Sequence, residues 1–250
     1  MDPRTRTELR ILKAYVILSI PALALVSLAA FARAERQPRF EEITVERINV
    51  VEKDGTLRLV ISNRERAPDA VFKGKTVRRS GGNSAGMIFY NDEGTEDGGL
   101  AIHGREEGGR YTAGGALLFD QFNQDQTIGI LYSDDSGRRS AALQVWDRPN
   151  ASLGALVERL QAIERMPEGA PKAQARAELE AAARRGEFGV TRLIAGKTRD
   201  KAAVVLLSDP RGRTRLRLAV DSTGAPRLDF LDESGRVTYA LPDSARAGRR

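Results

Sequence analysis

Residues 128–145 read IGILYSDDSGRRSAALQV, and this stretch carries the pattern that decides the fold. Apolar residues occupy every second position from 128 to 132, and the alternation resumes from 141 to 145. Because successive side chains of a strand point to opposite faces, this period of two is typical of a half-buried β-strand. Asp, Ser and Gly at 134–137 favour a tight turn between the two runs. The stretch therefore predicts a β-hairpin.

The same pattern recurs along the chain on both sides of this hairpin. Turn dipeptides such as Asp54-Gly55 separate short apolar runs, and the runs are too short and too closely spaced for an α/β fold. The expected strands lie at 43–50, 57–61, 87–90, 100–102, 116–119, 128–132 and 141–145 in a first region, and at 190–194, 202–207, 216–220, 228–231 and 237–241 in a second.

One turn sequence, D-x-x-G, occurs three times in the second region, at 209–212, 221–224 and 232–235. The Asp side chain can accept a hydrogen bond from the backbone two residues on, and Gly accepts a positive φ. Together these signals predict a mainly β fold, arranged as an antiparallel meander that is sandwich-like or barrel-like. A repeated Leu-Arg-Leu at 57–59 and 216–218 leaves open whether the two regions are duplicates or share only simple turn chemistry.

Two helices interrupt the strands between residues 151 and 186. Ser152 is a good helix cap, and apolar residues from Leu153 to Ile163 recur on one helical face. A second run at 173–185 is rich in Ala, Glu and Arg, and Gly186 suits a helix stop. We expect an αα-hairpin insertion that packs on a sheet edge or on a partner subunit, because its apolar stripe is narrow.

Residues 14–32 read AYVILSIPALALVSLAAFA and contain no charged residue. At about 1.5 Å of rise per residue, a helix of this length covers a hydrocarbon core of roughly 30 Å. We therefore expect one N-terminal transmembrane helix that anchors the chain in a lipid bilayer. Pro21 is tolerated as a kink in such a helix.

The charges that flank this segment give only a weak preference for its orientation. Arg and Lys residues between 4 and 13 favour a cytoplasmic N-terminus, but Arg33, Arg36 and Arg39 nearly balance them. The bulk of the chain is accordingly expected on the extracytoplasmic side, with a cytoplasm-facing domain as the alternative. A cleaved signal peptide is a further alternative, although its apolar region usually spans about 7 to 15 residues, shorter than this one.

Composition excludes several classes of site. The chain has no cysteine, so it has no disulfide and no thiolate ligand or nucleophile. Its single histidine, His103, makes a zinc site improbable. The net charge of +6 is spread along the chain without a basic block, so nucleic acid is not an expected partner. We expect no cofactor and no metal.

Three motif-like stretches fail their structural requirements. The G-x-S-x-G at 82–86 precedes a strand, whereas a nucleophile elbow needs a strand before the Ser and a helix after it. The Gly196-Lys197-Thr198 run lacks the earlier Gly and the following helix of a phosphate-binding loop. Acids from Asp92 onward lack the Gly and Glu positions of a helix-flanked calcium loop.

A polar stretch at the end of one predicted strand is the best candidate for a binding patch. Residues 120–126 read DQFNQDQ, in which carboxylates and amides are dense enough to line a groove. The candidate residues are Asp120, Gln121, Asp125, Gln126 and His103.

The sequence predicts a membrane-anchored, β-rich binding, accessory or scaffolding subunit rather than an enzyme. Its partner is expected to be another membrane or envelope protein, or a second copy of the chain. The alternative is a membrane-tethered glycan hydrolase with carboxylates among Asp92, Glu96, Asp120 and Asp125 as acid and base. The expected segments are a basic tail at 1–13, the membrane helix at 14–32, β regions at 33–150 and 187–243 around the helical hairpin at 151–186, and a disordered basic tail at 244–250.

Overall fold

The computed structural model describes residues 2–34, 39–72, 74–77 and 82–242. The chain forms two compact units, Met1–Val45 and Glu46–Arg250. The tail expected to be disordered at 244–250 lies outside the described residues.

The first unit contains one long helix, α1 (Pro3–Ala34), with Pro21 inside it. The helix includes the whole apolar run at 14–32 and begins well before it, so most of the expected basic tail is helical. From Pro3 to Ser27 the helix is long and apolar enough to cross a membrane.

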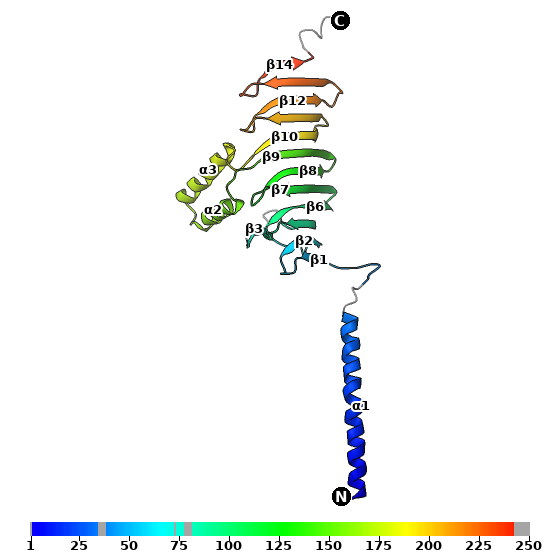
Figure 1. The fold of residues 1–250 in the computed structure, drawn as a ribbon. Helices are drawn as coiled ribbons and strands as arrows, with labels where there is room; N and C mark the ends of the chain where they lie inside the picture. Colours follow the sequence, from blue (N-terminus) through cyan, green and yellow to red (C-terminus); the bar gives the residue numbers. More distant parts are fainter. Residues whose placement is uncertain (1, 35–38, 73, 78–81, 243–250) are drawn as a thin grey trace. The chain divides into compact units, whose positions relative to one another are not determined.

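The second unit is built on one antiparallel sheet of twelve strands, which follow one another in chain order (Figure 1). The predicted meander is therefore confirmed, and β1 and β14 are the edges of an open sheet. Strands β9 and β10 pair directly across the helical insertion, so both predicted β regions belong to the same sheet. The strands are β1 (Arg47–Val51), β2 (Leu57–Ser62), β5 (Ala85–Tyr90), β6 (Glu96–Glu107), β7 (Arg110–Asp120), β8 (Gln126–Asp135), β9 (Arg138–Asp147), β10 (Val190–Lys197), β11 (Ala203–Ser208), β12 (Thr214–Val220), β13 (Pro226–Leu231) and β14 (Val237–Leu241).

Several strand boundaries differ from those expected. Strand β1 begins at Arg47, so Ile43 and Val45 precede it. Strands β6 to β9 extend into charged sequence, because residues of opposite charge lie opposite each other there, as in the pair of Glu107 with Arg110. Between β2 and β5, the short strands β3 (Ala70–Phe72) and β4 (Lys75–Val77) form a separate two-stranded sheet that apolar alternation did not predict.

The helical insertion consists of α2 (Leu153–Arg165) and α3 (Ala170–Arg184). As predicted, Ser152 caps α2, because its Oγ accepts a hydrogen bond of 3.2 Å from the Gly154 N–H. The start of α2 is attached to the β7–β8 turn, where the Leu153 N–H donates to the carbonyl of Asn123 at 3.1 Å. The helices thus lie beside the strand ends of the sheet (Figure 1).

Most of the strand connections use one turn geometry. The N–H of the first residue donates to the carbonyl of the fifth, and the N–H of the fourth donates back to the carbonyl of the first. Where the first residue is Asp209, its Oδ1 also accepts from the N–H groups of Arg211 and Arg213, at 2.9 and 3.1 Å. The three D-x-x-G turns all have this form. The turns lie at 52–56, 91–95, 121–125, 198–202, 209–213, 221–225 and 232–236.

The Gly at the fourth position can be tested with two matched variants. Gly212 and Gly224 both have positive φ, of +75° and +90°, which side chains disfavour. A methyl group at 224 meets open space, whereas one at 212 lies 3.0 Å from Cβ of Val190. We expect Gly224→Ala to lower the free energy of unfolding by about 1 kcal/mol and Gly212→Ala by about 2 kcal/mol. Urea denaturation of the full chain in detergent measures both free energies of unfolding. Equal losses for the two variants would show that the contact with Val190 does not destabilise Gly212→Ala.

Candidate functional site

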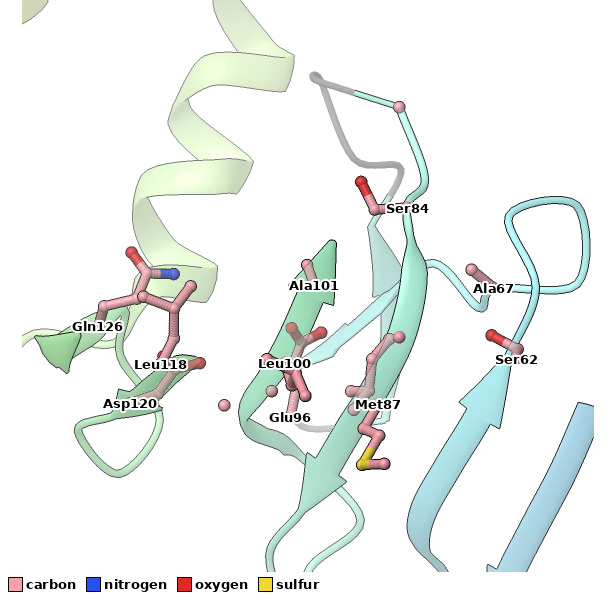
Figure 2. Close-up of a pocket in the computed structure, with 15 residues that line it drawn as sticks. Ser62, Ala67, Ser84, Met87, Glu96, Leu100, Ala101, Leu118, Asp120 and Gln126 are labelled. Atoms are coloured by element: carbon pink, nitrogen blue, oxygen red, sulfur yellow. The ribbon is translucent and has the colours of Figure 1, made fainter. Parts of the chain in front are cut away.

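A cavity of about 180 Å³ lies on the sheet where β5, β6 and β7 meet the segment that leads from β2 to β5. Glycines on neighbouring strands, Gly86 and Gly99, line the cavity, and a Cβ at either position would clash with a backbone carbonyl of the adjacent strand, of Leu100 or Met87 respectively. Polar side chains of Ser62, Ser84 and Gln126 also line it. Figure 2 shows these residues around the cavity together with Glu96 and Asp120.

Asp120 is the most perturbed group of this cavity. It ends β7, after a register shift that follows Phe119, and it pairs with Gln126 on β8. Its Oδ1 is enclosed by protein and makes no hydrogen bond to the described part of the chain. Burial raises the pKa of Asp120 to about 7, and the negative charges of Glu96, Asp125 and Asp97 act in the same direction, against the opposite effect of Arg148.

Glu96 brings a second carboxyl group to the cavity from the start of β6. In Figure 2 the carboxyl groups of Glu96 and Asp120 are directed into the same space from adjacent strands. Because Asp120 titrates near neutral pH, this pair can hold a proton at one carboxyl group beside a charged neighbour. Such a pair can attract a cationic group or transfer a proton. Among the described residues, no group of three or more His, Asp and Glu has the arrangement of a metal site.

Only two of the five residues predicted to form the polar patch lie at the cavity. Asp120 and Gln126 line the cavity, but the Gln121 amide donates to the carbonyl of Pro149 at 3.2 Å. Asp125 pairs with Arg148 at 3.5 Å, and both contacts help to hold the connection from β9 to the helices. His103 is exposed on β6, opposite Gly114, and is not among the residues lining the cavity.

Other residues of the site belong to motifs that do not meet their sequence requirements. Ser84 and its flanking Gly82 and Gly86, the G-x-S-x-G stretch, line the cavity, and strand β5 rather than a helix follows Ser84. Asp92 is at an exposed turn, 2.5 Å from Arg58, and does not line the cavity. Ser62 had no sequence signal, because its place depends on the pairing of β2 with β5.

Replacing Asp120 with Asn tests the electrostatics of the cavity. An aspartate in an unfolded chain titrates near pH 4 and Asp120 in the folded chain near pH 7, so stability falls as the pH rises through this interval. We expect the Asp120→Asn variant to exceed the parent in free energy of unfolding by about 2–4 kcal/mol at pH 8, and by much less at pH 4. Urea denaturation of the full chain in detergent at the two pH values measures this difference.

Ser84→Ala is the matched control, because it changes a lining residue without removing a charge. Its effect on stability should be the same at both pH values. A gain for Asp120→Asn that does not depend on pH would contradict the raised pKa.

A second feature, the apolar face of the sheet, is much larger than the cavity. Directly opposed residues run across all twelve strands in two adjacent rows on the same side of the sheet, and neither row contains a charged or amide side chain. We call these two rows the apolar face. The first row is Val50, Leu59, Phe89, Gly98, Phe119, Ile128, Val145, Leu193, Leu207, Leu216, Phe230 and Tyr239, and the second is Ile48, Ile61, Met87, Leu100, Leu117, Ile130, Leu143, Ala195, Val205, Leu218, Leu228 and Leu241.

No side chain of the apolar face is buried by the described residues. Ile130 is 59% exposed, Leu218 49% and Tyr239 54%. Scattered apolar residues are normal on a protein surface, but a contiguous patch larger than a few hundred Å² is typical of an interaction site. The apolar face is therefore a candidate binding surface.

The opposite face of the sheet is different in composition. At its central positions small residues, such as Ala116 on β7 and Gly196 on β10, are interspersed with large ones, such as Leu131 on β8. Near the C-terminal edge it carries Asp229, which is fully buried between Arg217 and Arg227. Burial acts to raise the pKa of Asp229, but hydrogen bonds from the two guanidinium groups outweigh it and lower the pKa. Charge is thus satisfied on this face, whereas the two rows of the apolar face carry none and the nearest charges on their side of β8 and β9, Asp134 and Arg139, pair with each other beyond the rows at 2.6 Å.

Comparison of the chain with protein-family models, curated proteins and solved structures gave no match. The functional argument therefore depends on the geometry of the cavity and of the apolar face.

Proposed function

We propose that this chain is a membrane-anchored binding or scaffolding subunit, and that the apolar face is its binding surface. The observation that carries the proposal is an uncharged surface of exposed and half-exposed apolar side chains that includes residues from every strand of the sheet. Apolar area of this extent gains free energy when a partner removes it from water. Strand edges and loop tips, through which β-rich domains also bind, offer a far smaller area than this face.

The anchor determines where such a subunit acts. Helix α1 is long and apolar enough to hold the chain in a bilayer. The basic residues before the apolar run favour a cytoplasmic N-terminus, which leaves the sheet on the extracytoplasmic side of a bacterial-type membrane. The proposed partners are therefore membrane or envelope proteins, including a second copy of the chain, and not nucleic acid.

Topology is tested by protease protection of intact spheroplasts that express the chain with an epitope tag after Arg250. We expect external protease to remove the tag, because the basic residues before the apolar run favour a cytoplasmic N-terminus. A cytoplasmic protein serves as the control for membrane integrity. Protection that only detergent removes would reverse the proposed topology.

Binding is tested with a photo-crosslinking amino acid at Ile130 or at Leu131, which are neighbours on β8 and point to opposite faces. We expect light to give a discrete protein adduct in membranes from position 130 and none from position 131. The matched pair shares the same strand and the same depth in the sheet, so a difference reports the face alone. Equal adducts from both positions, or none from position 130, would contradict binding through the apolar face.

The cavity favours one other function, carboxylate-dependent glycan hydrolysis. Glu96 and Asp120 share the cavity, and Asp120 is protonated below about pH 7, as a general acid must be. In this hypothesis Asp120 protonates the leaving oxygen and Glu96 acts as base or nucleophile.

This hypothesis is tested by incubating the full chain in detergent with purified cell-wall glycan and measuring the release of reducing ends. Activity is expected below pH 7, with losses of at least about 100-fold in Asp120→Asn and in Glu96→Gln. Asp92→Asn, at an exposed turn outside the cavity, is the control and should retain activity. Release that the cavity variants do not reduce would exclude hydrolysis at this site.

A further inference from the structure

The apolar face restricts what can cover it. An occupant must present apolar groups over the width of twelve strands, which at about 4.8 Å per strand is on the order of 55 Å. It must also lack charges over this distance, because the two rows offer no partner for a buried charge. A short peptide or a single helix does not meet both conditions.

A second copy of the chain meets both conditions by symmetry. A two-fold axis places the same surface on both partners, so each apolar face finds an uncharged face of equal length. Two sheets of the same twist stack at a spacing of about 10 Å with their strands about 30° apart, which keeps long sheets in contact. The sequence of one chain is therefore sufficient to specify the interface.

The area agrees with a stable dimer. Two rows of side chains at two-residue spacing cover roughly 14 Å along the strands, so the apolar face covers on the order of 750 Å² per copy. Two copies then bury on the order of 1,500 Å², which is within the range of standard, stable protein interfaces.

We infer that the apolar faces of two copies pack against each other, so that two single-layer sheets form one two-layer β-sandwich. This inference rests on the proposed binding function and names the partner. It also accounts for the few apolar side chains that the described residues bury within one chain: Val60, Ala70, Tyr90, Ile163 and Ala182. The dimer contributes the hydrophobic core that one sheet lacks.

The absence of cysteine allows a direct test in membranes that contain the full chain. The middle of the strand order lies between β8 and β9, so residues there are close to a two-fold axis and to their own symmetry mates. Ile130→Cys is expected to give a covalent dimer with a short bismaleimide. Leu131→Cys, on the opposite face of the same strand, is the matched control and is expected to remain monomeric.

A second variant measures the interface without a crosslinker. Ile130 is 59% exposed in one copy, so Ile130→Glu is tolerated by a single sheet but places a charge in the centre of the dimer. Light scattering of the full chain in detergent is expected to give two copies for the parent and at least a tenfold weaker dimer for Ile130→Glu. Circular dichroism confirms that the variant retains its strands.

Each contrary result has a distinct meaning. A monomeric parent with no crosslink at position 130 overturns the second copy as occupant. If the photo-crosslinker at 130 then captures a different protein, the binding function stands without self-association.

If the thiol of the Ile130→Cys variant reacts freely with a bulky aqueous maleimide and no adduct forms, both proposals fail. Quenching of a dye attached to that thiol by lipid-borne quenchers would identify the membrane surface as the occupant and also overturn the dimer.

Discussion

No side chain of the apolar face is buried by the described residues, and the other properties of the structure depend on this. Secondary structure usually gains stability by packing in two or more layers around a shared core. Here the twelve strands form one layer, held by backbone ladders and by a repeated turn that fixes the register of each hairpin. Such a layer keeps its shape through hydrogen bonds, but its hydrophobic surface contributes to stability only when a second surface covers it.

The strands were largely predictable because their signals are local. Leu216 and Leu218 flank Arg217, and this alternation assigns β12 and its apolar side without reference to any other strand. The pairing of β9 with β10 was not predictable, because the helical insertion separates the two strands in sequence. Alternation also gives no information about whether a second layer exists: the same pattern fits a sandwich, a barrel or an open sheet.

The cavity shows a similar division between local and long-range information. Asp120 was recognisable as a polar residue at the end of a strand, but its burial depends on strand β6 and on the segment between β2 and β5. Gln121 and Asp125, which have similar chemistry and lie in the same turn, instead hold the connection to the helices. Residue type alone could not separate the buried carboxyl group from those with structural partners.

The open meander also affects how the chain can change in evolution. A closed barrel fixes the number of its strands, because strand number, tilt and stagger must agree. In this sheet nearly every strand pairs with the one before and the one after it in sequence, so inserting or deleting a whole hairpin leaves the remaining pairs intact. Lengthening the sheet in steps of two strands would disturb little in a single copy. If two copies must cover each other, however, both layers need the same number of strands. Because one gene encodes both copies, an inserted hairpin lengthens both layers at once.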